Sequence, residues 1–211
     1  MFSKILISTC LVLVAINVNA TNANSCQVST IKPFLVEPKN KTLEILNPEV
    51  IQLEAGSFES ILGALPEAIM SDGVTLRRDN QFMGADGARY DPSREALILE
   101  GGVYYEDSGT QINSDNAEFS YGDGRIKFEG AKFYINASNG HGAADALEIN
   151  RNGRLELNNV EYTTCPIEND DWLIQGKSIL LDTKKGVSKV KGMKLRFKGL
   201  PILYTPYLSF P

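Results

Sequence analysis

Apolar and polar residues alternate with a period of two over most of the chain after residue 66. Ile126 and Phe128, for example, are separated by Lys127. Strict alternation puts one row of side chains on each face of a strand, as in a strand that is buried on one side. The stretch with the best helical spacing, 57–70, is interrupted by a glycine and a proline. The pattern therefore predicts an all-β protein of half-buried strands.

One strand phrase is repeated along the chain. Each copy is an alternating run, then a Gly or Asn, then a second alternating run, and the copies follow one another at intervals of about 30 residues. A Gly or Asn in mid-strand indicates a bulge or bend at which the strand turns a corner. Asp-Gly, Asn-Gly and Asp-Pro sequences between the runs predict tight turns. The central residues of the five copies are Gly73, Gly102, Gly130, Asn159 and Gly192.

Strand pairs that bury one face only against their neighbours stack into an elongated body. We predict an open, twisted β-jelly roll of stacked strand repeats, with a strand at each end available for pairing. The inward rows would form either a dry core or a groove for a lipid, and periodicity does not distinguish the two. The residues assigned to these rows are Ile98, Phe119, Ile126, Phe128, Phe133, Ile149, Leu155, Leu157, Leu195 and Phe197.

The beginning of the chain has the features of an export signal. One lysine precedes an almost uninterrupted apolar run, and Val18-Asn19-Ala20 matches a small-residue cleavage site. The run is too short to span a bilayer comfortably. The expected organisation is a signal peptide over 1–20, an N-terminal segment with Cys26 over 21–46, the strand repeats over 47–198, and a linker over 199–211 in which Pro201, Pro206 and Pro211 interrupt the strand pattern.

Composition and charge narrow the classes of function. With 43% hydrophobic and 22% charged residues the chain is globular in composition, and its net charge of −5 argues against a nucleic-acid partner. Cys10 lies inside the predicted signal. Cys26 and Cys165 would remain in the exported chain, where cysteines most often form disulfides.

Candidate chemistry is sparse. The sole histidine, His141, lies between two glycines without Cys, His or paired acids at ligand spacing, so we expect neither a metal nor a cofactor. Asp170 and Asp171 are adjacent and would point to opposite faces of a strand, which favours a solvated loop over an acid–base pair. The sequence has no nucleophile elbow, zinc-protease motif or phosphate loop. We therefore expect a protein that is not an enzyme.

The last part of the chain has the most specific motifs. They are Tyr162-Thr-Thr-Cys165-Pro166, then Asp171-Trp172-Leu, then Leu181-Asp182, and finally Pro201-Ile-Leu-Tyr204-Thr-Pro206-Tyr207-Leu-Ser-Phe210-Pro211. In order and spacing they resemble the LptD (OstA) family of LPS-assembly proteins, in which the last motif leads into an outer-membrane barrel. The repeats are similar to the OstA-type domain that this family shares with LptA and LptC.

This resemblance implies a lipopolysaccharide transport module that is exported to the periplasmic side of the outer membrane. It implies an apolar jelly-roll interior for acyl chains and pairing of an edge strand with an LptA-like bridge protein. The chain is expected to stop before the barrel, so an LptE-like lipoprotein partner is expected only where a barrel is present. In the family, cysteines at the places of Cys26 and Cys165 bond to a cysteine pair near the end of the barrel. Here the two could be free, paired with each other, or bonded to another chain.

Three other interpretations stay open. A stand-alone LptA-like or LptC-like bridge protein would resemble the repeats only, and the Cys165-Pro166 and Tyr204–Tyr207 motifs speak against it. A carbohydrate-active β-solenoid would need convergent carboxylates on one strand face, whereas the outward charges here mix both signs. A purely structural repeat protein would leave the C-terminal motifs unexplained.

Overall fold

The computed structural model describes residues 50–63, 67–166, 171–182 and 185–210. Within these residues twelve strands form one sheet, and the helical structure is a single 3₁₀ turn. The elements are β1 (Gln52–Ile61), β2 (Glu67–Arg78), β3 (Gln81–Ala85), β4 (Gly87–Asp91), β5 (Ala96–Glu106), β6 (Thr110–Ser120), β7 (Ile126–Ile135), η1 (Asn136–Ser138), β8 (Gly140–Ile149), β9 (Arg154–Thr163), β10 (Trp172–Asp182), β11 (Val187–Phe197) and β12 (Leu200–Phe210). The described residues contain no helix of the length and apolarity that a membrane span requires. The predicted all-β fold is confirmed.

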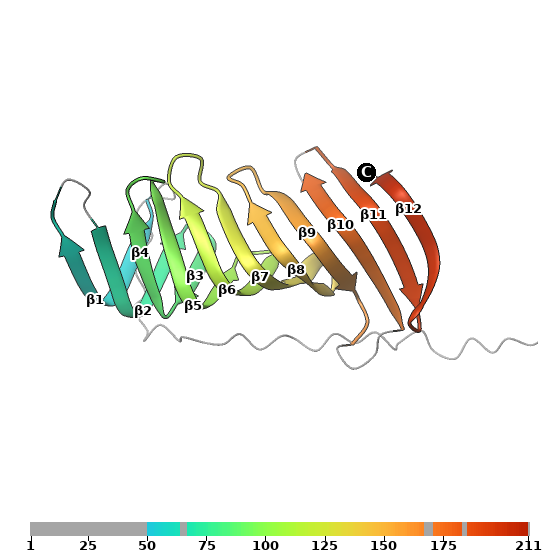
Figure 1. Ribbon diagram of the computed structural model, residues 1–211, viewed down its shortest axis with the longest axis horizontal. Coiled ribbons are helices and arrows are strands. Elements are labelled where there is room, and N and C mark those ends of the chain that lie inside the picture. The colour runs from blue at the N-terminus through green and yellow to red at the C-terminus, as the bar shows by residue number, and fades with distance from the viewer. Residues whose placement is uncertain (1–49, 64–66, 167–170, 183–184, 211) are drawn as a thin grey trace, which may run out of the picture.

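The strands follow one another through the sheet in chain order, and every neighbouring pair is antiparallel (Figure 1). β3 and β4 together fill one position between β2 and β5, and they are separated at Asp86. Chains of consecutive hairpins of this kind need only short connections. Among the described strands, β1 and β12 are the two edges of the sheet.

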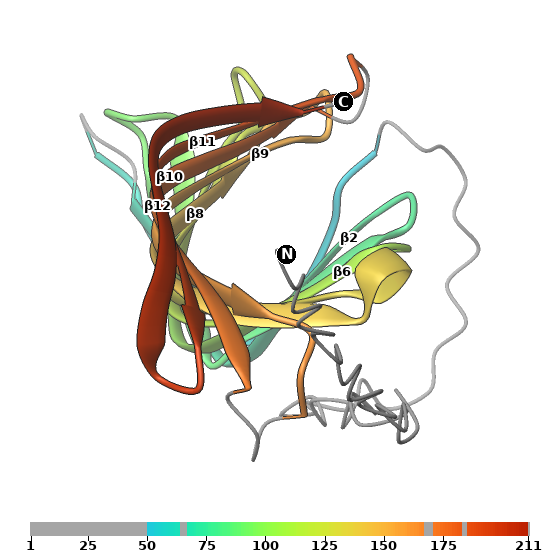
Figure 2. The same ribbon diagram turned by 90° about the vertical axis from the view of Figure 1, so that its right-hand side faces the viewer.

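The strands bend at the Gly or Asn in the middle of each repeat. Gly73, Gly102, Gly130, Asn159 and Gly192 all have positive φ, between 47° and 87°. The pairing of β5 with β6 shifts register between Glu100 and Val103. Mid-strand residues in this region of backbone space produce bulges that increase the bend and the twist of a strand. The predicted bends are confirmed, and they curve the whole sheet around a long axis (Figure 2).

The bends divide the sheet into two half-sheets that face each other. Half-sheet A consists of residues 57–61, 67–71, 87–91, 96–100, 116–120, 126–129, 146–149, 154–158, 178–182, 187–191 and 207–210, and half-sheet B of residues 52–55, 74–78, 81–85, 103–106, 110–114, 131–135, 140–144, 160–163, 172–176, 193–197 and 200–205. The rings of Tyr105 in half-sheet B and Phe128 in half-sheet A meet edge-on at 5.5 Å. The predicted open, twisted jelly roll is confirmed, with its core between the two half-sheets.

The core extends from β2 to β9 and thins out toward both ends. Its largest fully buried side chains include Tyr105, Phe128 and Phe133. At the ends the same face is open, with Phe58 of β1 65% exposed and Leu200 of β12 69% exposed. The middle strands are therefore covered on their inner face, while the two edge strands present apolar side chains to the surroundings.

β12 corrects one expectation from the sequence. The strand runs through Pro201 and Pro206, so the predicted interruption of the strand pattern at these prolines is wrong. A proline lacks the N–H that a central strand needs, but in an edge strand the missing donor on the outward side breaks no ladder bond. Pro206 also falls opposite the bulge at Gly192, between the pairs Thr205–Met193 and Tyr207–Lys191. Pro211 lies outside the described residues.

Candidate functional site

The face between the half-sheets, here called the interior face, carries most of the predicted apolar rows. It brings together side chains from β6, β7, β8 and β9 that are at most 9% exposed and belong to one core cluster. Alternation along each strand produces this arrangement, because every second side chain faces inward. The predicted residues on this part of the face are Phe119, Ile126, Phe128, Phe133, Ile149, Leu155 and Leu157.

The prediction that Ile98 belongs to the inward row is wrong. Its neighbours Leu97 and Leu99 are 1% and 0% exposed and belong to the core cluster. Ile98 therefore points to the opposite face of β5, where it lies beside Arg89 and Glu118. The sequence 96–99 has four apolar residues in a row, so alternation alone did not determine which of them turn inward.

The interior row continues past the core at the C-terminal end of the sheet. Leu195 pairs with Ile174 of β10 and Leu203 of β12. Leu195 is partly buried, whereas Phe197 is 48% and Leu203 50% exposed. These side chains continue the predicted row but are not enclosed, because β12 has no further described strand beyond it.

Several of the best buried interior side chains were not among the predicted rows. Tyr105, Leu99, Ile112 and Leu147 are all fully buried. Leu97 and Leu99 could have been found by testing both phases of alternation in β5, and Ile112 by extending the alternation of β6 toward its start. Tyr105 gave no such signal, because it follows another tyrosine and either ring could have faced inward.

The rim of half-sheet B carries a polar network at the margin of the interior face. Arg78 donates from Nε and Nη2 to Gln81 Oε1, at 3.1 and 2.6 Å. Gln81 Nε2 donates to the Tyr105 hydroxyl at 3.0 Å, and this hydroxyl donates to Asp107 Oδ2 at 2.9 Å. Burial, followed by the negative charge of Asp107, raises the pKa of Tyr105 far above its usual range, so the hydroxyl keeps its proton and its role as a donor.

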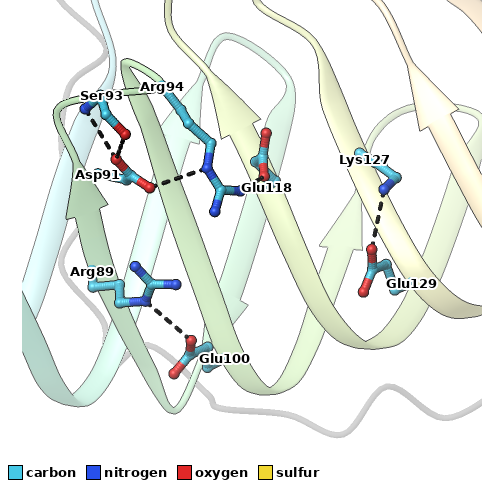
Figure 3. A network of polar contacts seen from close by, with 8 residues as sticks. All are labelled: Arg89, Asp91, Ser93, Arg94, Glu100, Glu118, Lys127 and Glu129. Carbon is cyan, nitrogen blue, oxygen red and sulfur yellow. Dashed lines mark hydrogen bonds and ion pairs between the residues drawn. The ribbon is translucent and has the colours of Figure 1, made fainter.

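The outer face of half-sheet A is covered by paired charges (Figure 3). Arg94 contacts Asp91 at 3.1 Å and Glu118 at 3.0 Å, and Lys127 contacts Glu129 at 3.1 Å. Arg89 and Glu100 form a further pair at 3.4 Å. The hydroxyl of Ser93, with the charge of Arg94, lowers the pKa of Asp91. Solvent-exposed pairs of this kind add little stability, but they make this face unsuitable for an apolar ligand.

The Cys-Pro loop is anchored between the end of β9 and the start of β10. Cys165 is fully buried, and its backbone N–H donates to Thr163 Oγ1 at 3.1 Å. Thr163 Oγ1 in turn donates to the backbone oxygen of Trp172 at 2.7 Å, and the Trp172 ring meets Tyr162 at 6.2 Å. Cys26 lies outside the described residues, so the predicted disulfide role of the two cysteines stays a prediction.

His141, Tyr204 and Tyr207 lie apart from the interior face. His141 is in β8, opposite Tyr134 and Thr163. Tyr204 and Tyr207, from the motif that resembles a barrel linker, are 61% and 51% exposed on β12. Phe210 ends this strand. Asp170 lies outside the described residues, and within the described part of the chain no three His, Cys, Asp or Glu side chains gather into a metal-binding group.

Comparisons with known proteins point to one kind of relative. The chain is 26% identical over 192 residues to the LPS-assembly protein LptD of Shewanella oneidensis, covering 91% of this chain and 25% of that protein. It is 30% identical over 179 residues to LptD of Nitrosococcus oceani, covering 83% of this chain and 24% of that protein. It is 26% identical to LptD of Saccharophagus degradans over 92% of this chain. The chain therefore spans about a quarter of the length of these relatives.

Among solved structures, the fold is similar to LptH of Pseudomonas aeruginosa, an LptA-homologous periplasmic component of the lipopolysaccharide transport device. The TM-score is 0.43 and the sequence identity 13%, over 62% of this chain and 94% of that chain. No protein-family model matches the chain.

Proposed function

Because this chain is related to the LPS-assembly protein LptD over 91% of its own length, we propose that it is a module for the transport and assembly of lipopolysaccharide. In this proposal the interior face holds acyl chains of the lipid between the two half-sheets. The module receives lipid at one end of the sheet and passes it on toward the outer membrane. It acts by binding and guiding the lipid, with no catalytic step and no cofactor.

One observation carries the proposal: an apolar row runs the length of the sheet on one face and is uncovered at both ends. Phe128 in the middle is fully buried, whereas Phe58 and Leu203 at the ends are half-exposed or more. An acyl chain in contact with this row gains the free energy of apolar burial, about 0.8 kcal/mol for each methylene removed from water. The charged outer face offers no comparable surface.

A lipid can enter only where the half-sheets separate. Their contact is made by side chains, such as the rings of Tyr105 and Phe128, and the two half-sheets are joined through the bends of the strands. In this proposal the packed interior face is the unloaded state, and acyl chains displace contacts between the half-sheets while the ladders within each remain.

Site-specific photocrosslinking to lipopolysaccharide tests the proposal. A photoreactive residue at Phe128 or Leu195 should form adducts, and one at the neighbouring outward positions, Lys127 and Lys194, should not. Each pair lies in a single strand one residue apart, so the two positions differ only in the face they occupy. Folded protein without adducts at either inward position would mean that the interior face is a dry core and that the proposal is wrong.

The edge strands support a second part of the proposal, pairing with a bridge protein of the LptA kind. β1 and β12 each present ten or eleven residues of backbone on the outward side of the sheet. An unpaired edge is a template for another strand, and apolar side chains such as Phe58 add area to the contact. A proline at position 55 in β1, in place of Ala55, should weaken binding of such a partner at this edge, measured by crosslinking between the two strands.

The signal peptide, the two cysteines and the C-terminal segment complete the proposal. The signal peptide over 1–20 exports the chain to the periplasm. The segment over 21–46, with Cys26, and the loop of Cys165 provide the disulfide contacts, either with each other or with another chain. The C-terminal segment 199–211, of which Leu200–Phe210 form the edge strand β12, leads on to a barrel in proteins of full length, where an LptE-like lipoprotein would bind. A stand-alone bridge protein remains the alternative, and the mass of the non-reduced protein isolated from its native envelope distinguishes the two.

A further inference from the structure

The line along which the open margins of the two half-sheets meet is here called the seam. The guanidinium group of Arg78 lies across it. Arg78 is the last residue of β2 in half-sheet B, and its Cζ lies 5.7 Å from the centre of the Phe119 ring in half-sheet A. Leu76, Met83 and Ile126 line a shallow hollow together with these two residues. Arg78 is therefore a cation set at the margin of an apolar interior, on the inward face.

The charge of Arg78 is not neutralised by a carboxylate among the described residues. None of the ion pairs found in this part of the chain includes it. Its hydrogen-bond acceptor is the neutral Gln81, whose Oε1 accepts from Nε and Nη2 and so fixes the plane of the guanidinium. The Nη1 edge is left to face another acceptor. On the outer face, by contrast, Arg89, Arg94 and Lys127 all lie against carboxylates (Figure 3).

The nearest acid in the network, Asp107, is directed elsewhere. Its Oδ1 accepts the backbone N–H groups of Gly109 and Thr110, and its Oδ2 accepts the Tyr105 hydroxyl. Gln81 and Tyr105 separate this carboxylate from Arg78. The network therefore holds the guanidinium in place and does not cancel its charge, which is the arrangement that an anion-binding arginine requires.

We propose that Arg78 binds a phosphate group of the lipid whose acyl chains lie between the half-sheets, and that it thereby selects phosphorylated lipid. This inference rests on the proposed function, since it assumes acyl chains in the interior. The planar guanidinium can donate two parallel hydrogen bonds to a phosphate, one from Nη1 and one from the second N–H of Nη2, while the lipid's chains pass Phe119 into the interior. The contact between Arg78 and Phe119 across the seam then opens as lipid enters.

Equilibrium binding by the full chain tests the inference with two probes: the lipid anchor of lipopolysaccharide in its phosphorylated form, and the same anchor after removal of its phosphates. The unaltered protein should bind the phosphorylated anchor about tenfold or more tightly than the other. Arg78→Gln should abolish this preference and leave the affinity for the phosphate-free anchor unchanged. Arg78→Lys, which keeps the charge but not the planar fork, should retain part of the preference.

Arg77→Gln is the matched control. Arg77 precedes Arg78 in β2 and also borders the hollow, but its guanidinium stacks on Phe82 at 4.9 Å on the other face of the strand. This variant should keep the full preference for phosphate. Equal affinity of the unaltered protein for both probes, or an equal loss for both in Arg78→Gln, would overturn the inference while leaving the proposed function intact. Binding of neither probe would overturn the proposed function itself.

Discussion

At the scale of single residues, the environment of a side chain follows from the face it occupies and from its distance to the ends of the sheet. Phe128 and Phe58 both lie on the interior face, because Phe58 pairs with the buried Met70. Phe128 is fully buried between the half-sheets, whereas Phe58 is 65% exposed on the edge strand. The same type of side chain therefore contributes differently to stability at the two positions.

Phe128→Ala should lower the free energy of unfolding by about 3–5 kcal/mol, because the substitution removes a buried ring and leaves a cavity. Phe58→Ala, the matched change at the edge, should cost less than about 1 kcal/mol. Urea unfolding followed by tyrosine and tryptophan fluorescence measures both values. Losses of equal size would show that the interior at Phe128 is not closed in solution.

The ionisation of Tyr105 makes the stability of the fold depend on pH. Burial, together with Asp107, raises its pKa in the folded chain, whereas in the unfolded chain the hydroxyl ionises near pH 10. Its contribution to stability is therefore complete below about pH 10 and is lost as the pH rises toward the pKa of the folded state. In this pH range the ionisation of Tyr105 lowers the free energy of unfolding by up to about 1.4 kcal/mol per pH unit. In Tyr105→Phe the free energy of unfolding should fall less steeply with rising pH above about pH 10. Urea unfolding at several pH values measures this slope, and a slope equal to that of the unaltered protein would contradict the role given to Tyr105.

At the scale of elements, the bends in mid-strand set the shape of the sheet. Gly73 has a φ of +87°, and a Cβ built on it would meet no atom within 4 Å. A side chain at this position would therefore be disfavoured by the backbone conformation and not by contact. Gly84, in the neighbouring strand β3, lies outside the left-handed region, and a Cβ there would make an ordinary contact with the Phe82 ring at 3.7 Å.

Gly73→Ala should destabilise the fold by about 1–2 kcal/mol, the cost of left-handed backbone for a residue with a Cβ. Gly84→Ala should change stability by no more than about 0.5 kcal/mol. Thermal unfolding of the two variants side by side provides the comparison. If both glycines tolerate alanine equally, the bend at Gly73 does not need its left-handed conformation.

At the scale of the whole molecule, each strand is supported mainly by its neighbours, so stability should fall from the middle of the sheet toward its edges. The core cluster takes its buried members from β2 to β9, while β12 contributes none. Strands in stacked repeats depend on nearest-neighbour contacts, and local opening is easiest where buried apolar contacts are fewest.

Native-state hydrogen exchange should therefore show the slowest amides in β5, β6 and β7, and amides of β12 that exchange faster. β7 and β12 are of similar length and are both paired antiparallel, so β7 is the internal reference. Exchange of β12 as slow as that of β7 in the isolated chain would mean that another contact covers this edge.

Much of this fold is determined locally by the sequence. The alternation of Ile126, Lys127 and Phe128 fixes opposite faces for adjacent residues, since successive side chains in a strand point to opposite sides. A glycine such as Gly130 is the residue that adopts positive φ at no steric cost, so the positions of the bends could be predicted as well. The relation to lipopolysaccharide assembly proteins was also apparent from the C-terminal motifs alone.

Only the tertiary structure decided which face becomes the interior and how far it is covered. Ile98 lies in an apolar run in which either phase of alternation is possible, and packing against the opposite half-sheet selected Leu97 and Leu99. The position of Arg78 on the seam depends on contacts with Gln81 and Phe119, and Phe119 is distant in sequence and lies on the other half-sheet. Periodicity is a property of one strand, whereas burial and the placement of a charge depend on which strands face each other. Which strands face each other is determined only when the sheet curves around its axis.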